Sequence, residues 1–330
     1  MTTAYTGDDQ LYFHTFLAPL QPLLRRSDVT DLYINRPGEL WTEALGGKIE
    51  RHEMPELTEQ LLMRLAKQIA AVNHQGISRE HPLLSASLPS GERVQIVAPP
   101  ATRGPPAFAI RKHVSPDLRL QDYVATGAFA DTKIGTEVQG NQSKAGISEM
   151  LSKGDVTGAL VAAVRARLTI LVSGGTSSGK TTFLNSLISE IDPAERLIFI
   201  EDTPELKMQH ENAVGLLAPR SILGEAQVTA NDLVSASLRM RPDRIILGEL
   251  RGEEAFSFLR AINTGHPGSM TTIHANSPVN AVEQIILLVM QGGTRLSCDD
   301  VRNYVRNIVD VYVHLGRTAA GRVIDQVIIA

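Results

Sequence analysis

The residues with the clearest chemical potential form one short stretch in the middle of the chain, GGTSSGKT at positions 174–181. The stretch fits the pattern G-x-x-x-x-G-K-[ST], in which backbone N–H groups cradle phosphates and a lysine reaches the β- and γ-phosphates. Lys180 and Thr181 take the last two positions, and the Thr181 hydroxyl is the expected Mg²⁺ ligand. The stretch therefore predicts a nucleotide site. Its expected phosphate-binding residues are Gly174, Gly175, Thr176, Ser177, Ser178, Gly179, Lys180, Thr181 and Thr182.

The flanking sequence supplies the context that such a loop requires. Residues 168–173 are a short β-branched apolar run, typical of a buried strand, and residues 182–190 continue with helical spacing. One position departs from the commonest form of the loop, because Ser177 stands where glycine is usual. If this residue needs a positive φ, serine costs about 1 kcal/mol of strain.

Three downstream segments place polar residues where apolar strands are expected to end. These segments are residues 197–201, ending in Glu201, residues 244–249, ending in Glu249, and residues 269–274, ending in His274. Open α/β sheets bind ligands at such strand ends. Phosphoryl transfer to water needs a phosphate cradle, a metal and a group that orients the water, and Glu249 fits the last role. The alternatives are a surface carboxylate for Glu249 and a structural histidine for His274.

A second carboxylate is needed near the metal. A strict second nucleotide motif would carry aspartate where Gly248 stands. We therefore expect Glu201 or Glu205 to supply the outer-shell carboxylate.

Composition bounds the class of protein. The length of 330 residues favours two domains, and 43% hydrophobic with 21% charged residues is typical of a globular chain. A net charge of −4 and 5% aromatic residues argue against a nucleic-acid-binding face, so no direct nucleic acid binding is expected. The single Cys298 indicates a reducing compartment, and neither a signal peptide nor a membrane span is evident. We expect a cytoplasmic protein with at most peripheral membrane contact.

The order of patterns divides the chain into three parts. Residues 1–126 alternate short strands with an amphipathic helix over residues 57–72, which predicts an α+β domain. Residues 127–154 are rich in Gly, Ser, Thr, Gln and Lys and are interpreted as a linker. Residues 155–330 alternate helices and strands, which predicts an α/β domain with a parallel sheet covered on both faces and an antiparallel edge.

Strand parity places two arginines of the first part on one face. Arg93 is opposite to Val94 and Ile96 in one expected strand, and Arg111 is opposite to Phe108 and Ile110 in another. Taken alone, two such arginines are better explained as solvated surface charges, and only the family resemblance described below favours a functional role.

The quoted motifs together resemble a known family. GGTSSGKTT, IFIEDTPEL, LRMRPDRIILGELRGEEA and GHPGSMTTIHANS are similar, in order and spacing, to the Walker A, Asp-box, Walker B and His-box segments of the secretion-ATPase superfamily. The resemblance runs from about residue 29 to the end. PLLSA, GERVQIV and IRK, at positions 82–112, are similar to the N-terminal domain of the type IV secretion and conjugation branch. The absence of a tetracysteine module counts against the type II secretion branch.

The resemblance implies a fold, a site and an assembly. It implies a RecA-like P-loop ATPase domain with an α+β N-terminal domain that closes over ATP. It also implies a homo-hexamer that contacts channel components at the cytoplasmic face of the inner membrane. By motif position, Glu249 is the catalytic carboxylate, His274 senses the γ-phosphate, and Arg93 and Arg111 contact the nucleotide.

Three other functions remain open from the sequence. A pilus extension or retraction ATPase shares the same motifs. A nucleic-acid translocase also uses RecA-like rings, although the acidic charge argues against it. A scaffold that binds nucleotide but hydrolyses little draws support from Ser177 and Gly248.

Overall fold

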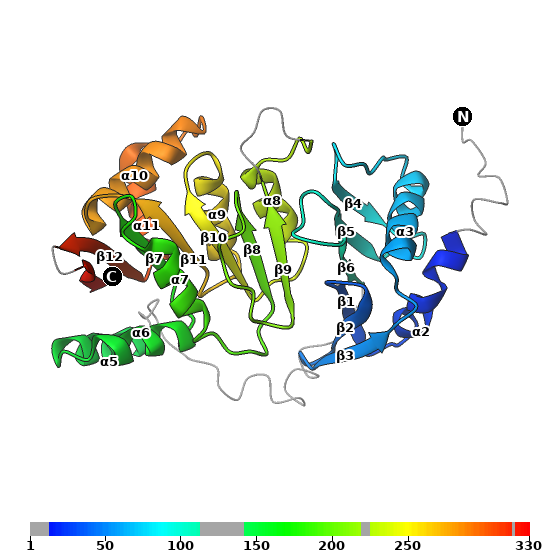
Figure 1. Ribbon diagram of the computed structural model, residues 1–330, viewed down its shortest axis with the longest axis horizontal. Helices are drawn as coiled ribbons and strands as arrows, with labels where there is room; N and C mark the ends of the chain where they lie inside the picture. The colour runs from blue at the N-terminus through cyan, green and yellow to red at the C-terminus, as the bar shows by residue number, and fades with distance from the viewer. Residues whose placement is uncertain (1–12, 113–141, 219–224, 319–320) are drawn as a thin grey trace, which may run out of the picture.

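Two sheets lie side by side in the molecule (Figure 1). The computed structural model describes residues 13–112, 142–218, 225–318 and 321–330. The N-terminal domain lies beside β9 (Ala213–Leu217), the edge strand of the larger sheet, and the C-terminal hairpin lies at the opposite edge. The α/β fold class predicted from the sequence is confirmed.

The N-terminal sheet has six antiparallel strands in the order β3-β2-β1-β6-β5-β4. Helix α3 and the first helical turns cover one face, because α3 directs Leu62, Leu65 and Ile69 onto the sheet. Thr58 begins this helix by accepting a hydrogen bond from the N–H of Leu61. The elements are η1 (Ala18–Leu20), α2 (Gln21–Leu24), β1 (Val29–Ile34), β2 (Gly38–Ala44), β3 (Ile49–Met54), α3 (Glu59–Val72), β4 (Leu83–Ser87), β5 (Arg93–Val97) and β6 (Ala107–Arg111).

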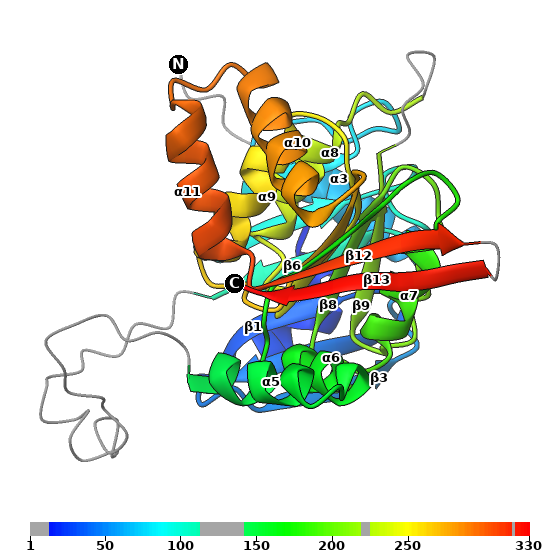
Figure 2. The same ribbon diagram turned by 90° about the vertical axis from the view of Figure 1, so that its left-hand side faces the viewer.

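The C-terminal sheet has seven strands in the order β13-β12-β7-β11-β10-β8-β9. All neighbours are parallel except the edge strand β13, which pairs antiparallel with β12. Helices α8 to α11 cover one face and α5 to α7 the other (Figure 2). The elements are α5 (Gln142–Ser152), α6 (Val156–Arg165), β7 (Ile170–Gly174), α7 (Lys180–Ile188), β8 (Leu197–Glu201), β9, α8 (Ala230–Ser237), β10 (Arg244–Leu250), α9 (Glu254–Asn263), β11 (Met270–His274), α10 (Pro278–Gln291), α11 (Cys298–Ile308), β12 (Val311–Thr318) and β13 (Gly321–Ile329).

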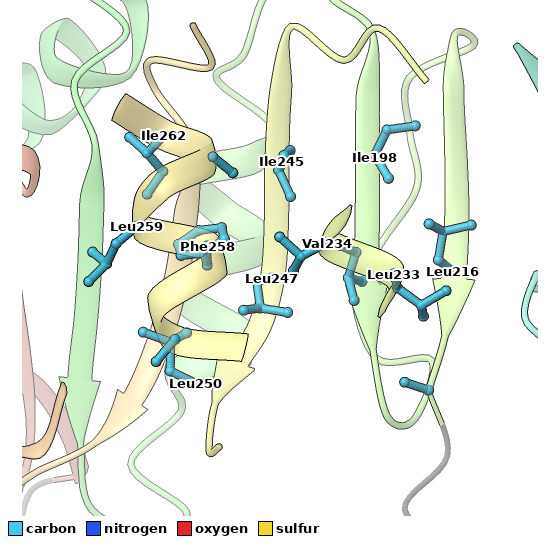
Figure 3. Packing of buried hydrophobic residues seen from close by; sticks show 14 of the residues in the cluster. Ile198, Leu216, Leu233, Val234, Ile245, Leu247, Leu250, Phe258, Leu259 and Ile262 are labelled. Atoms are coloured by element: carbon cyan, nitrogen blue, oxygen red, sulfur yellow. The ribbon is translucent and has the colours of Figure 1, made fainter. Parts of the chain in front are cut away.

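The central strands are apolar on both faces, as a sheet sandwiched between helices requires. Ile245 and Leu247 of β10 lie on the side of α8 and α9, in one cluster with Phe258 (Figure 3). The intervening Ile246 belongs to the cluster beneath α6 and α7. This alternation fixes the register of β10 and therefore the place where its polar C-terminal end emerges.

Backbone pairing joins the two domains. Residues 101–103 run along the free edge of β9, where Thr102 forms an antiparallel bridge with Leu216. The N–H of Arg103 donates to the carbonyl of Gly215 at 2.9 Å. A segment of the N-terminal domain thus extends the larger sheet at its edge.

A buried arginine also joins the domains. Arg196, 1% exposed, lies with its guanidinium 4.2 Å from the centre of the Tyr33 ring of the N-terminal domain. Its Nη1 donates to the side-chain oxygen of Asn35 at 2.7 Å and to that of Asn212 at 2.5 Å. Because the guanidinium is shielded from water, its contacts replace hydration that burial has removed.

Some elements were not predicted from the sequence. Strands β3 and β4 were missed, because both are half-exposed edge strands with little apolar alternation. Of the expected linker, residues 127–141 lie outside the described residues, and residues 142–152 form α5. This helix packs against α6 and buries Ile147, a contact that polar composition conceals.

Candidate active site

The phosphate loop follows β7 and leads directly into α7, as the motif requires. Ser177 has φ +60°, which places its backbone in the left-handed region. This is the conformation in which a serine was expected to be strained. Gly179 has φ +94° and takes the N-cap position of α7. A β-carbon on Gly174 would lie 2.5 Å from Ser178 Oγ and 2.8 Å from the Leu315 carbonyl oxygen, so only glycine fits there. The loop conformation therefore depends on glycine at two positions and tolerates serine at a third.

Lys180 is the buried cation of the loop. It is 7% exposed, and its Nζ donates to the carbonyls of Gly174 at 3.1 Å and Gly175 at 3.3 Å. Burial lowers the pKa of its ammonium group, which the negative charge of Glu249 partly offsets. The ammonium group thus lies inside the loop, where a phosphate would complete its charge balance.

Glu249 brings the end of β10 to the same place. Its Oε1 lies 4.0 Å from Lys180 Nζ and 2.9 Å from His274 Nε2, without forming a hydrogen bond of good geometry. Its Oε2 is ion-paired with Arg251, which also contacts Asp202 at 2.7 Å. One carboxylate oxygen is thereby fixed by an arginine, while the other is a buried acceptor without a hydrogen bond from the described residues.

His274 stands at the end of β11, next to the loop. Its ring Nδ1 lies 3.4 Å from Lys180 Nζ, and its side chain is 44% exposed. Parallel pairing of β11 with β7 sets His274 opposite Gly174. The ends of β7, β10 and β11 therefore converge as the sequence predicted, and the His274 ring lies close to both Lys180 and Glu249.

Glu201 and Glu205 have different environments. Glu201 is buried, forms an ion pair with Arg103 of the N-terminal domain, and its Oε2 accepts the N–H groups of Glu205 at 2.9 Å and Leu206 at 2.8 Å. Glu205 is exposed. A β-carbon on Gly248 would lie 3.3 Å from Glu201 Cγ, so the Glu201 side chain occupies the space that an aspartate at position 248 would need. Both glutamates line the cavity, and Glu205 has the freer carboxylate.

A cavity of about 400 Å³ collects these groups. Its lining was predicted from the sequence for the loop and for the three strand ends. Asp202, Thr203, Arg251, Thr272 and Arg322 were not predicted as site residues: the first four lie in or beside the predicted segments, whereas Arg322 is far away in sequence on β13. The lining residues are Thr176, Ser177, Ser178, Gly179, Lys180, Thr181, Thr182, Glu201, Asp202, Thr203, Glu205, Gly248, Glu249, Arg251, Thr272, His274 and Arg322.

Arg93 and Arg111 do not line this cavity. They stand directly opposite each other in the β5–β6 pairing and are both exposed, so the parity argument is confirmed. Together with Arg239 they line a separate cavity of about 610 Å³. The Nε of Arg111 donates to Asp31 Oδ1 at 2.8 Å. Their expected contact with nucleotide stays a prediction.

Protein ligands for a metal are few. Among the described residues, no group of three or more His, Cys, Asp or Glu side chains is placed to hold a metal ion. Mg²⁺ typically keeps several waters and binds through one or two protein groups plus substrate phosphates, and Thr181 with a neighbouring carboxylate fits that mode. In the same parts of the chain, no helix is long and apolar enough to cross a membrane.

Residues 15–309 match the family described as "Type II/IV secretion system protein". The chain belongs to this family. It is 38% identical to the type IV secretion system protein VirB11 of Bartonella henselae over 92% of this chain and 88% of that one. It is 40% identical to the type IV secretion system protein PtlH of Bordetella pertussis over 95% and 93% of the two chains.

The fold agrees with these sequence matches. The crystal structure of the VirB11 ATPase from the Brucella suis type IV secretion system superposes with a TM-score of 0.91 at 36% identity, covering 98% of this chain and 95% of that one. The chain is thus an ATP-hydrolysing secretion ATPase of the type IV branch, with a RecA-like C-terminal domain. The prediction of a type IV secretion ATPase is therefore confirmed over the alternative of a pilus motor. The alternative of a scaffold that hydrolyses little is not supported.

Proposed function

We propose that the chain hydrolyses MgATP in the cavity beside the phosphate loop and drives transfer through, or assembly of, a type IV secretion or conjugation apparatus. The observation that carries the proposal is the convergence of Lys180, Glu249 and His274 at the ends of three neighbouring strands. We further propose that it acts as a homo-hexamer, bound peripherally to channel components at the cytoplasmic face of the inner membrane.

Lys180 and the loop backbone would bind the phosphates. The ammonium group exchanges the carbonyls of Gly174 and Gly175 for phosphate oxygens, while the first N–H groups of α7 point at the same anion. Thr181 would hold Mg²⁺, with Glu205 or Glu201 acting through water. When bound, the ion neutralises charge that develops on the β- and γ-phosphate oxygens.

Glu249 would orient the attacking water. Arg251 holds its Oε2, so the carboxylate cannot rotate freely, and its buried Oε1 is left as the acceptor for a water proton. His274 lies close to that oxygen and to Lys180. Loss of the γ-phosphate would therefore change the charge that surrounds the imidazole ring.

Arg93 and Arg111 would stabilise the triphosphate-bound state. In one chain they lie on another cavity, so they reach a nucleotide only after a change in domain arrangement or from a neighbouring subunit of a ring. Their guanidinium groups would form charge-assisted hydrogen bonds that exist only with triphosphate present.

Two substitutions test the site. Lys180→Ala is expected to abolish nucleotide binding, whereas Glu249→Gln retains ATP binding and loses turnover by about 100-fold or more, because only the water-orienting charge is removed. ATP hydrolysis and equilibrium binding of a fluorescent ATP analogue measure the two effects. Lys153→Ala, which removes an exposed lysine that directly follows α5, is the control and is expected to behave as wild type. Near-normal hydrolysis by Glu249→Gln would transfer the catalytic role to Glu201 or Glu205.

Membrane association has its own test. Because no helix among the described residues can span a bilayer, high salt or carbonate should release the protein from membrane fractions. Resistance to both washes would contradict a peripheral attachment.

A further inference from the structure

Arg322 of β13 lies over the start of α7. A β-carbon on Gly179 would lie 3.0 Å from Arg322 Cδ and 3.5 Å from its Nε, and the arginine lines the cavity beside the phosphate loop. The hairpin that carries it passes beside α7 (Figure 2). A side chain more than 140 residues away in sequence is thus held against the loop glycine by the pairing of β12 with β7.

The exposed Arg322 guanidinium forms no ion pair or hydrogen bond with a side chain in the described parts of the chain, so it is open to an anion that enters the cavity. Its directly opposite residue in the β12–β13 pairing is Arg317, which is also exposed. Like charges directly opposite on neighbouring strands are destabilising. A cation held at this cost beside an anion-binding loop is explained if an anion belongs there.

The strand order fixes which part of the anion Arg322 faces. β11 and β10, which carry His274 and Glu249, lie on one side of β7, and β12 with β13 lies on the other. The γ-phosphate must lie on the Glu249 side for hydrolysis. The α-phosphate end of the nucleotide must then lie on the other side of β7, which is the side of Arg322.

We propose that Arg322 binds the α-phosphate of the nucleotide and raises the affinity for ATP and ADP alike. This rests on the proposed role of the cavity as the ATP site. Because the contact is the same in substrate and product and does not involve the transferred phosphate, it is uniform binding, which changes KM and leaves kcat alone. It differs in this from Glu249, whose loss changes kcat.

The test compares full-length variants by equilibrium binding of ADP and of a non-hydrolysable ATP analogue. Arg322→Ala is expected to weaken both by the same factor, about five- to tenfold, with kcat at saturating ATP within about twofold of wild type. Arg322→Lys keeps the charge and is expected to retain most of the affinity.

Arg317→Ala is the matched control. It removes the same charge from the same hairpin outside the cavity and is expected to bind nucleotide as wild type does. Both arginines are exposed and repel each other, so neither alanine variant should impair folding, which the thermal midpoint checks.

Each contrary result has a distinct meaning. If Arg317→Ala weakened nucleotide binding as much as Arg322→Ala does, Arg322 would act only through long-range charge. If Arg322→Lys bound nucleotide as weakly as Arg322→Ala, the arginine would stack on the base rather than bind phosphate. Selective weakening of the ATP analogue would place the contact at the γ-phosphate. Any of these overturns the proposal. Unchanged binding in Arg322→Ala while Lys180→Ala loses binding overturns this inference alone, whereas retained binding in Lys180→Ala overturns the nucleotide site itself.

Discussion

The cavity beside the phosphate loop and the cavity that Arg93 and Arg111 line both carry basic side chains, but they differ in how far one chain completes them. At the phosphate loop, buried Lys180 faces the carboxylate of Glu249, and several strands supply the wall. In the N-terminal domain, Arg93 and Arg111 are exposed, and of the two only Arg111 has an acidic partner, Asp31, among the described residues.

The difference shows which site can act alone. Charges that are buried must be balanced within the fold, so the phosphate-loop cavity has its own network before any ligand binds. Exposed arginines are hydrated and need no such balance, so they are available to a phosphate brought from outside their domain. We therefore expect substitutions in the first cavity to alter stability or chemistry and those in the second to alter coupling.

The largest structural effect is expected from Arg103→Ala. Arg103 joins the N-terminal domain to buried Glu201, and removing it leaves that carboxylate without its cation, at a cost of about 3 kcal/mol in the free energy of unfolding. Urea unfolding monitored by circular dichroism measures the change. Arg79→Ala breaks an exposed ion pair to Glu225 across the same two domains and serves as the control, with little expected change. Equal midpoints for the two variants would mean that Glu201 does not need its partner.

A smaller effect is expected from the double substitution Arg93→Ala and Arg111→Ala. The proposed ring should still assemble and the phosphate loop should stay intact, but ATP affinity or turnover should fall about tenfold, and compaction on ATP binding should decrease. Small-angle scattering with a non-hydrolysable ATP analogue measures the compaction. Arg64→Ala, on the exposed side of α3, is the control. If the double variant compacts as wild type does, both arginines are ordinary surface charges.

The smallest effect is expected at Ser177. Ser177→Gly relieves the strain at φ +60° but adds freedom to the unfolded chain, so the net gain in stability should stay below about 1 kcal/mol. Nucleotide affinity should rise slightly, because the loop takes its phosphate-binding shape more easily. His74→Gly, at φ 54° and far from the loop in sequence, is the control for affinity and should leave nucleotide affinity unchanged. If Ser177→Gly and His74→Gly changed nucleotide affinity by the same amount, relief of strain in the loop would not be the cause of the change.

Local patterns predicted most of the site. The phosphate loop is contiguous in sequence, and Glu249 and His274 follow apolar strands whose parallel order brings their ends together. Arg322 could not be found in this way, because its position depends on the pairing of β12 with β7. The ion pair between Arg103 and Glu201 likewise depends on how the two domains meet.

The fold was predicted where burial leaves a periodic signal. Strand β8 has the predicted bounds, residues 197–201, since every side chain in it is buried. Strand β3 carries Glu, Arg and His on an edge, and α5 is polar enough to resemble a linker. Both are held by contacts with neighbours that sequence periodicity does not record.

The pairing of residues 101–103 with β9 has a consequence for solubility. An uncovered edge strand offers unpaired N–H and C=O groups to any other chain, and β9 is apolar along most of its length. In the intact protein the N-terminal domain caps this edge. A C-terminal domain severed from it would therefore be expected to aggregate through β9, even though its phosphate loop and Glu249 remain in place.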